Sequence, residues 1–475
     1  MSQVQRPGPV FVELPVDILY PYEVIAEQFT SMSKASTPQK GDDLSKQSIS
    51  KKSSLKTKII SAYSKYSLNH IFADAWRDRD FDPLPVHLQL PKSSQVDEIS
   101  ETLQKSQRPL FIIGSQAVLR PFGPDPLATN IKKLGIPVYL NGAARGLLGA
   151  DYPLQFRHAR KEAVREADCV ILLGAICDFR LSYGRIFKSS TKVISVNRCK
   201  KAAALNAGVF WRPSIVLESD VASFVNSLCL KLSGKTADGE VNGAETSRIS
   251  SKLSVDKEWI ATLARRDAEK DRSIESMAIE KTDKYINPLR VLLKLRETFA
   301  KDDTILVADG GDFVASASYI MKPCGPLRWL DPGPFGTLGC GAGFALAAKL
   351  AFPERQVVAI MGDGAFGYAI PEIDTFVRHK LPVYWIIGND ACWTQIAREQ
   401  VPMLGSPIGC ELTYTDYNRV AEGFGAIGYK ISEDAEISDK EILKTTRSDL
   451  IDKNNTVVVN ALIGKTKFRD GSISV

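Results

Sequence analysis

The sequence predicts an α/β protein built from two parallel-sheet domains, each a sheet sandwiched between helices. Short apolar runs alternate with helical patterns in two separate blocks, and such alternation is typical of parallel strands joined by crossover helices. A polar stretch from Ser233 to Asp256 separates the blocks. With 475 residues, of which 44% are hydrophobic, the chain can build two or three cores of ordinary domain size.

Charge and cysteine usage exclude several other classes of protein. The 61 basic and 55 acidic residues leave a net charge of +6, and several excess lysines lie in one Ser/Lys-rich stretch, so we expect no nucleic-acid partner. The eight cysteines form no CxxC pair and no close metal-ligand spacing with the four histidines, which favours reduced thiols. The N-terminus has no apolar run of signal-peptide length, and no segment reaches the roughly 18 apolar residues of a membrane span.

From the N-terminus, the first predicted segment is a linker. The stretch from Thr30 to Lys58 is rich in Ser, Lys and Thr and has few large apolar residues, so it cannot bury enough surface to fold alone. We assign residues 21–90 to this linker and expect part of it to be disordered.

The central block, residues 91–232, contains the first predicted sheet. We expect strands at PLFIIGS, IPVYL, CVILLGA and VISVN, and helices near Asp125–Leu134 and Arg160–Ala167. Residues 233–284 follow as a polar linker with a charged helical segment.

The C-terminal block, residues 285–475, contains the second predicted sheet. It opens at Asn287 and Pro288 and continues with strands expected at TILVADG, QVVAIMGDG, PVYWIIGND and TVVVNALIG.

One βαβ unit in this block carries polar side chains at both strand ends. It reads GDGAFGYAIPEIDTFVRHKLPVYWIIGND, with Asp363 after the first strand and Asn389 and Asp390 after the second. Because the crossover makes the strands parallel, we expect these side chains at one edge of the sheet, where open α/β sheets bind ligands. Carboxylate and amide oxygens suit Mg²⁺, which also takes phosphate oxygens and water. The unit predicts a metal-diphosphate site, with the amides of Gly364 and Ala365 facing the phosphates.

Other interpretations of the glycine-rich segments are weaker. Taken singly, GDG is a common tight turn and Asn-Asp often opens a loop. No GxxxxGK(S/T) sequence is present, which argues against a P-loop. The cluster GPFGTLGCGAGFALAAKL runs G-x-G-x-G from Gly339 but has Phe344 where a dinucleotide site needs a later glycine, and LDP from Leu330 predicts no strand before it.

The spacing of these motifs resembles that of thiamine diphosphate enzymes. GDG, Glu372 in the following helix, LP, and an Asn-containing pair about 27 residues after Asp363 are similar to their cofactor motif, and GTLGCGAGFALAA is similar to their cofactor loop. From PGPVFVELPVD to FRDGSISV, the chain most closely resembles the acetolactate synthase-like 2-hydroxyacyl-CoA lyases. The resemblance implies a central Rossmann-like domain and a C-terminal domain that binds thiamine diphosphate.

By this resemblance, Asp363 binds Mg²⁺ and Asp390 is a second ligand. The usual Asn-Asn pair of the relatives has become Asn389-Asp390 here, which exchanges an amide oxygen for a carboxylate oxygen. Asn389 stays open as the alternative ligand.

The resemblance also implies the residues that hold the cofactor. Leu338 falls where an apolar pivot bends thiamine, in the segment Gly336, Thr337 and Leu338 that contacts the aminopyrimidine. The diphosphate end would be lined by residues that follow two strands, namely Gly310, Gly311, Asp312, Gly362, Gly364 and Ala365. For VADGGDFV, the alternative is a glycine turn with a solvated aspartate.

The central domain is less informative about ligands. Its relatives bind FAD, an adenine nucleotide or nothing on this fold. The candidate stretches are GSQAVL, NGAARGLLG and DFRLSYGR, in which Arg145 and Arg180 are either phosphate ligands or solvated side chains.

Residues 1–20 are interpreted as the remnant of a pyrimidine-binding domain that complete relatives carry. GPVFVELPVD, residues 8–17, looks like its last strand. In the relatives that domain supplies the glutamate that protonates the aminopyrimidine across a dimer interface, so no catalytic residue is assigned in this chain. A positioned proton donor is typically worth ~10² to 10⁴ in rate, and we expect the shortened chain to be inactive by itself. The membrane anchor of full-length relatives, which lie in the endoplasmic reticulum membrane, is also not found, which predicts a cytoplasmic chain.

The implied activity is cleavage of 2-hydroxyacyl-CoA to formyl-CoA and a shortened fatty aldehyde, as in fatty acid alpha-oxidation, with thiamine diphosphate and Mg²⁺ as cofactors. The alternative enzyme is an acetolactate synthase-type transferase that acts on a 2-oxo acid. The alternative outside the enzymes is a protein that binds the cofactor without catalysis or pairs with full-length subunits. We otherwise expect a homo-oligomer.

Overall fold

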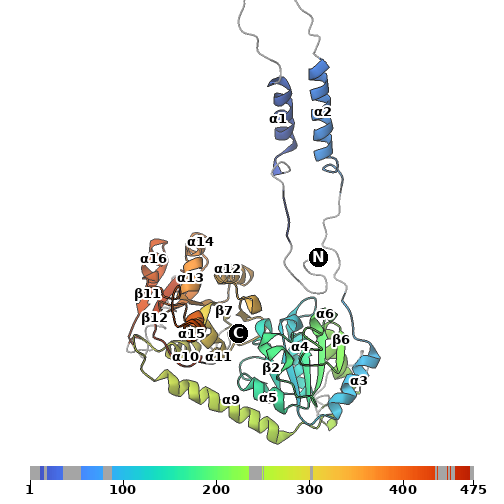
Figure 1. The fold of residues 1–475 in the computed structure, drawn as a ribbon, viewed down its shortest axis with the longest axis vertical. Helices are drawn as coiled ribbons and strands as arrows, with labels where there is room; N and C mark the ends of the chain where they lie inside the picture. The colour runs from blue at the N-terminus through green and yellow to red at the C-terminus, as the bar shows by residue number, and fades with distance from the viewer. Residues whose placement is uncertain are drawn as a thin grey trace, which may run out of the picture. The chain divides into compact units, whose positions relative to one another are not determined.

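The computed structural model divides the chain into two compact units, Met1–His87 and Leu88–Val475 (Figure 1). No helix in the described part of the chain combines the length and the hydropathy that a membrane span requires. The described residues are 11–14, 19–35, 55–78, 88–234, 249, 251–299, 303–433, 436, 447, 450 and 455–470.

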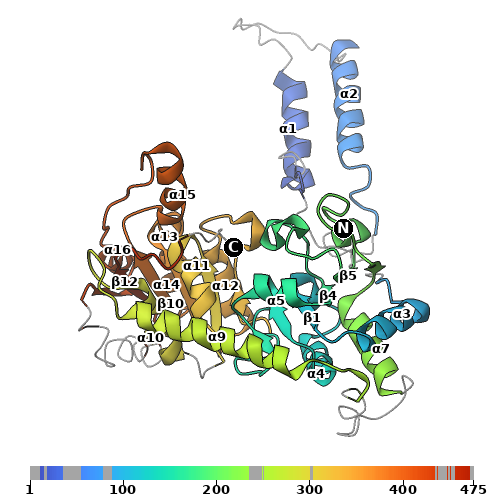
Figure 2. The same ribbon diagram turned by 60° about the horizontal axis from the view of Figure 1, so that its bottom comes forward.

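The first unit contains two helices within the segment predicted as a linker, α1 (Tyr22–Ala35) and α2 (Leu55–Ile71). They lie side by side in Figures 1 and 2, and the ring of Tyr22 meets that of Phe72 edge to face at 5.1 Å. The linker prediction for residues 21–90 missed these helices because it extended the composition of the Ser/Lys-rich stretch, residues 30–58, to the segments on either side.

Three sequence predictions fall largely outside the described residues. These are the Ser/Lys-rich middle of the linker, most of the polar stretch 233–256, and the strand predicted at residues 8–17. Only residues 11–14 of that strand are described, and they have no regular secondary structure.

The second unit begins with a parallel sheet whose described strands run in the order β3-β2-β1-β4-β5-β6. Helices α3, α4 and α7 pack on one face of this sheet, and α5 packs on the other. The predicted strands and helices of this block are all present, which confirms the first predicted parallel sheet and its helices. The elements are β1 (Pro109–Ile113), β2 (Val138–Leu140), β3 (Gln155–Phe156), β4 (Cys169–Leu173), β5 (Lys192–Asn197), β6 (Ile215–Glu218), α3 (Ser93–Gln104), α4 (Pro124–Leu134), α5 (Arg160–Glu166), α6 (Lys200–Ala203) and α7 (Val221–Ser233).

The long helix α9 (Lys257–Ala278) connects the two cores of the second unit (Figure 2). The carboxylate of Asp256 caps its start by accepting the N–H of Glu258 at 2.9 Å. Near that end Trp259 packs in the central core, while Ile274 near the other end packs in the C-terminal core. Each end of the helix is therefore fixed to a different domain.

The second sheet is also parallel, with its described strands in the order β11-β12-β10-β9-β7-β8. Helices α10 and α11 cover one face, and α12, α13, α14 and α16 cover the other. The elements are β7 (Ile305–Asp309), β8 (Trp329–Leu330), β9 (Val357–Gly362), β10 (Tyr384–Asn389), β11 (Ile427–Ile431), β12 (Val457–Leu462), α10 (Pro288–Phe299), α11 (Gly311–Ile320), α12 (Gly341–Ala351), α13 (Asp363–Ala369), α14 (Glu372–Arg378), α15 (Thr394–Leu404) and α16 (Tyr417–Gly423).

The prediction of no strand before the second glycine cluster was wrong. Trp329 and Leu330 form the short edge strand β8, which pairs with β7 at Leu306 and Val307. A strand of two residues is too short to give an alternation signal, and only its pairing with β7 reveals it.

The register places the carboxyl ends of β7, β9 and β10 next to one another. Asp309 in β7 lies opposite Met361 in β9, and Gly362 in β9 lies opposite Gly388 in β10. The chain leaves β7 toward β8 and leaves β9 toward β10 on the other side, so the direction of winding reverses between β7 and β9. Ligands of open parallel sheets bind at such a reversal. The predicted juxtaposition of Asp363 with the Asn389-Asp390 pair at one sheet edge is confirmed.

Close packing at Gly388 generates a stability prediction. A Cβ at this position would stand 2.3 Å from Cγ of Phe313, which is buried on α11. Gly388→Ala should therefore lower the free energy of unfolding by about 1–3 kcal/mol through overpacking, measured by urea unfolding. Gly423→Ala is the matched control because nothing lies within 4 Å of its added Cβ. The control should be neutral or stabilising by up to about 1 kcal/mol, and equal losses in the two variants would contradict the packing argument.

Candidate functional site

Two carboxylates stand at the ends of neighbouring strands. The buried apolar strand β9 ends at Gly362, and α13 begins at the next residue, so Asp363 lies directly at the strand end. Strand β10 is also buried throughout and ends at Asn389, which puts Asp390 at the matching position one strand away.

Asp363 is almost completely buried, with 3% of its surface exposed. Its Oδ1 accepts the N–H of Gly364 at 2.8 Å, whereas its Oδ2 is buried and has no hydrogen-bond partner among the described residues. Burial, and to a smaller extent the charge of Asp390, raises the pKa of Asp363 to about 7. The nearby backbone N–H groups of Gly364, Cys392 and Ala391 lower the pKa and so oppose this shift. A buried carboxylate in this position needs either a proton or a cation.

Asp390 is in a similar state. Burial raises its pKa to about 6, although the Thr394 hydroxyl, which donates to its Oδ2, opposes the shift. The negative charge of Asp312 raises the pKa further and the positive charge of Lys465 lowers it. Two neighbouring carboxylates that both resist ionisation are the chemistry expected of a site for a divalent cation.

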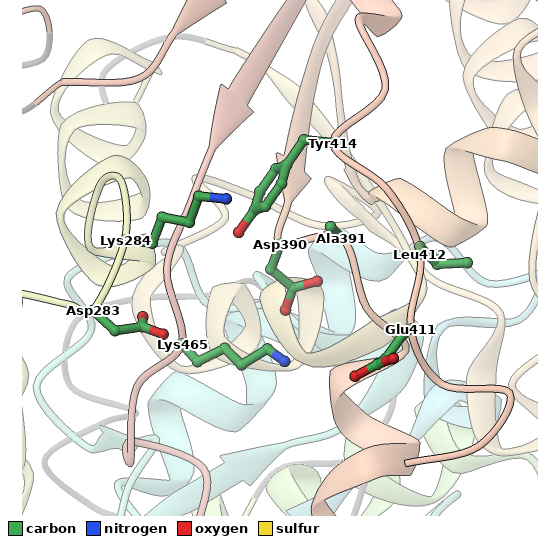
Figure 3. Close-up of a pocket in the computed structure, with 8 residues that line it drawn as sticks. All are labelled: Asp283, Lys284, Asp390, Ala391, Glu411, Leu412, Tyr414 and Lys465. Carbon is green, nitrogen blue, oxygen red and sulfur yellow. The ribbon is translucent and has the colours of Figure 1, made fainter.

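A cavity of about 300 Å³ lies beside Asp390 (Figure 3). Lys465 and Asp390 point toward one another in it, which agrees with the electrostatic effect of Lys465. The lining residues are Asp283, Lys284, Asp390, Ala391, Glu411, Leu412, Tyr414 and Lys465.

The amide of Asn389 is engaged in the sheet. Its Nδ2 donates to the carbonyl of Thr415 at 3.0 Å and to Oδ1 of Asn460 at 3.2 Å, and its Oδ1 accepts the N–H of Ala391 at 3.3 Å. The side chain is fully buried. Asn389 therefore ties β10 to β12 and to the following loop, while Asp390 is the member of the pair that lines the cavity.

The backbone after Asp390 is strained. Ala391 has φ of +54°, a left-handed conformation that a residue with a Cβ adopts only when its surroundings enforce it. The strain directly follows the predicted metal ligand, as is common at functional sites.

The predicted pivot Leu338 meets two other predicted site residues. A Cβ on Gly310 would lie 2.8 Å from Cδ2 of Leu338 and 2.5 Å from Cβ of Ala365. Gly310 also has φ of +80°, so only glycine suits this position. A Cβ on Gly362 would lie 3.0 Å from the carbonyl oxygen of Gly310. The structure thus brings the loops after β7, β8 and β9 together at one point.

The remaining predicted residues are placed as follows. Gly336, with φ of +68°, and Thr337 are exposed just before Leu338, and Gly311 begins α11. Gly364 lies under the ring of Trp393, which would be 2.3 Å from an added Cβ.

The side chain of Asp312 is not free. Its Oδ2 accepts a hydrogen bond from Arg398 at 2.8 Å, and 15% of each side chain is exposed. Burial nevertheless raises the pKa of Asp312, although Arg398 opposes the shift. The Asp312 carboxylate thus links α11 to α15. Only the backbone of Asp312 is then free to contribute to an anion site.

The two arginines considered for phosphate binding in the central domain are engaged elsewhere. The half-buried Arg145 donates to the carbonyl of Ser318 at 2.8 Å, and its guanidinium lies over the ring of Trp329 at 5.3 Å. Arg180 forms an ion pair of 2.7 Å with Asp178. Both arginines therefore have structural partners, and Arg145 joins the central domain to the C-terminal domain.

Sequence reasoning missed three residues that shape the site: Asp309, Asp331 and Trp393. Asp309 ends β7 and accepts the N–H of Gly341 at 2.7 Å, Asp331 accepts the N–H of Gly333 at 2.8 Å, and Trp393 covers Gly364. The available signals were an aspartate directly before Gly310, an aspartate two residues before Gly333 and an aromatic residue after the Asn-Asp pair.

Within the described residues, no group of three or more His, Cys, Asp or Glu side chains is arranged to hold a metal ion. A cation at Asp363 and Asp390 would thus take its other ligands from oxygens of the backbone, phosphate or water, as Mg²⁺ commonly does.

Comparison with known proteins gives matches in both domains. Residues 96–228 match the central domain of thiamine pyrophosphate enzymes, and residues 309–461 match their C-terminal TPP binding domain. Thiamine pyrophosphate and thiamine diphosphate are the same compound.

Individual relatives cover the chain to different extents. This chain is 44% identical over 475 residues to 2-hydroxyacyl-CoA lyase 2 of Danio rerio, and the match covers 100% of this chain and 70% of that protein. It is 43% identical over 474 residues to the Homo sapiens protein of the same name, covering 100% of this chain and 69% of that protein. It is 32% identical over 380 residues to the acetolactate synthase large subunit IlvG of Mycobacterium tuberculosis, covering 79% of this chain and 64% of that protein.

The raised pKa values predict how the stability of the metal-free protein depends on pH. Asp363 and Asp390 bind protons more tightly in the folded state, at about 7 and about 6, than in the unfolded chain at about 3.8. The free energy of unfolding should therefore fall as pH rises from about 4 to about 8. Asp363→Asn should flatten this decline, measured by urea unfolding with EDTA at pH 5 and pH 8.

The control for this prediction is Asp374→Asn, which changes an exposed carboxylate on α14. This variant should keep the decline of the unmodified protein. If Asp363→Asn shows the same pH dependence of the free energy of unfolding as the control, protonation of Asp363 does not cause the decline.

Proposed function

The chain belongs to the thiamine pyrophosphate enzyme family, and from this premise we propose that it is a thiamine diphosphate- and Mg²⁺-dependent lyase. The proposed reaction is cleavage of a 2-hydroxyacyl-CoA to formyl-CoA and a shortened fatty aldehyde. The observation that carries the proposal is the sequence identity of 43–44%, over the whole chain, to proteins named 2-hydroxyacyl-CoA lyase 2.

The metal site of this proposal consists of Asp363 and Asp390. The unpartnered, buried Oδ2 of Asp363 fits a cation, because binding would neutralise a charge that burial disfavours. Asp390 is preferred over Asn389 as the second ligand, because the Oδ1 of Asn389 accepts the N–H of Ala391 and Asp390 is the residue that lines the cavity.

The proposed cofactor contacts lie on the loops that converge at Gly310. Gly336, Thr337 and Leu338 would hold the aminopyrimidine end, with Leu338 supported from behind by Gly310. The diphosphate end would lie against the backbone of Gly311, Asp312, Gly362, Gly364 and Ala365. When bound, thiamine diphosphate supplies the nucleophilic carbon and the electron sink for carbon–carbon cleavage.

The chain's own residues would bind and orient the cofactor. Asp363 and Asp390 would fix the metal and the diphosphate through it, and the convergence of Leu338, Gly310 and Ala365 would fix the ring. No catalytic acid or base is proposed among the described residues, and no flavin or adenine nucleotide is proposed for the central domain. The homo-oligomer expected from the sequence and the endoplasmic reticulum location of longer relatives stay predictions.

An acetolactate synthase-type reaction is the second candidate. It is favoured by a sequence identity of 32% to an acetolactate synthase subunit. That match covers 79% of the chain, whereas the matches to the lyases cover 100%. The two candidates share the cofactor and the metal and differ in the substrate, which is a 2-hydroxyacyl-CoA for the lyase and a 2-oxo acid for the synthase.

Substitution of the two carboxylates tests the metal site. Loss of an outer-shell partner of a metal typically costs about 10–100-fold in affinity, so loss of a ligand in Asp363→Ala should exceed about 100-fold in Mg²⁺-dependent thiamine diphosphate binding. Asp390→Asn should retain most of the affinity because its amide oxygen can still bind Mg²⁺. Both affinities are measured by isothermal titration calorimetry, with circular dichroism to confirm the fold. An unchanged affinity in Asp363→Ala would refute the site.

The substrate is tested by assaying both reactions with the purified chain and cofactors. Formation of formyl-CoA and aldehyde in equal amounts from 2-hydroxyacyl-CoA would support the lyase and would contradict the expectation, drawn from the sequence, that the chain is inactive by itself. Acetolactate formation would favour the second candidate. Cofactor binding without either product would favour a binding role.

A further inference from the structure

The loop that carries Gly336 and Leu338 is exposed in its middle and anchored at both ends by aspartates. Residues 333–338 are exposed to solvent. At the entry, Asp331 accepts the N–H of Gly333 at 2.8 Å and the indole N–H of Trp329 at 2.6 Å. Because Trp329 is 2% exposed, this end of the loop is tied to a buried side chain of β8.

The exit of the loop is held by Asp309 at the end of β7. This side chain is fully buried, and its Oδ2 accepts the N–H of Gly341 at 2.7 Å. Gly341 is the first residue of α12, an 11-residue helix, so the carboxylate also faces the positive end of the helix dipole. Burial raises the pKa of Asp309, and the N–H groups of Gly341 and Gly339 oppose this by stabilising the charge.

Close packing fixes the path of the chain at this exit. A Cβ on Gly341 would stand 2.7 Å from Cβ of Asp309, and one on Gly339 would stand 2.8 Å from Cβ of Tyr368 on α13. Gly339 also has φ of +84°. The loop therefore passes between β7 and α13 along a route that leaves no room for side chains.

The same strand end supports the predicted pivot. Gly310, the residue after Asp309, has no room for a Cβ because Leu338 and Ala365 pack against it. Asp309 thus holds the loop at Gly341 while its neighbour Gly310 receives Leu338. Burial of a carboxylate at a strand end is destabilising. Here the buried carboxylate fixes the position of the loop.

We propose that Asp309 is a positioning residue that holds the Gly336–Leu338 segment in the place from which it contacts the ring end of thiamine diphosphate. The inference rests on the proposed function and assigns no contact between Asp309 and the cofactor. It predicts that removing the Asp309 charge affects the ring end of the ligand and spares the diphosphate end, which Asp363 and Asp390 hold through the metal.

The test uses Asp309→Asn, which keeps the side-chain volume and weakens the acceptor. Isothermal titration calorimetry measures two probes in the presence of Mg²⁺, thiamine diphosphate and inorganic diphosphate. Loss of a hydrogen bond to a charged group should lower the affinity for thiamine diphosphate about tenfold or more. The affinity for inorganic diphosphate should stay unchanged. Asp374→Asn, on the exposed face of α14, is the matched control and should change neither affinity.

Each other outcome has a definite meaning. Equal affinity of Asp309→Asn and the unmodified protein for thiamine diphosphate would overturn the inference, and so would parallel loss of both probes, which indicates general damage at the strand end. If the unmodified protein binds inorganic diphosphate but not thiamine diphosphate, or binds neither probe, the proposed function fails and the inference fails with it.

A second measurement applies if Asp309→Asn does not fold. In the unmodified protein, the amide of Gly341 should exchange with deuterium more slowly than those of Thr337 and Leu338, because the Asp309 carboxylate accepts its N–H. Equal exchange rates for the three amides would overturn the inference without any variant.

Discussion

The repulsion between two buried carboxylates is the constraint on which the site depends. Asp363 directly follows β9 and Asp390 directly follows β10, so the register of these strands holds the two residues at adjacent strand ends. Burial makes the ionised form of each carboxylate unfavourable, and the charge of Asp390 raises the pKa of Asp363 further. A bound divalent cation would offset both the burial of the two charges and the repulsion between them. This explains how a stable fold can keep two acidic side chains at a position where, without a cation, they lower its stability.

The fold supplies this arrangement through close backbone packing. Gly310, Gly362, Gly364 and Gly388 each occupy a position where a side chain would collide with a neighbouring element. Their absence of side chains lets the loops after β7, β8 and β9 approach within van der Waals distance at the reversal of strand order. The site is consequently built mainly from backbone and small residues, and the larger groups Trp393 and Leu338 enclose it.

The sequence predicted the parts that depend on local patterns. Strands β9 and β10 are continuous apolar runs, and α14 has apolar residues at helical spacing, so the βαβ unit and the shared edge of Asp363 and Asp390 followed from the sequence. Contacts between distant segments were not predictable. Asp309 and Gly341 are 32 residues apart, Gly364 meets Trp393 across the helices between them, and Arg145 is matched to Ser318 of the other domain. Helices α1 and α2 were missed for a different reason, because the prediction extended the Ser/Lys-rich composition of residues 30–58 to the whole of residues 21–90.

The most direct test of this account is calorimetric titration of the unmodified chain with thiamine diphosphate, first with MgCl₂ and then with EDTA. The account predicts saturable binding with Mg²⁺ and its loss when the cation is removed, because the diphosphate would otherwise face two uncompensated carboxylates. Equal affinity under both conditions, or no binding with Mg²⁺ present, would contradict the claim that Asp363 and Asp390 form a metal-diphosphate site.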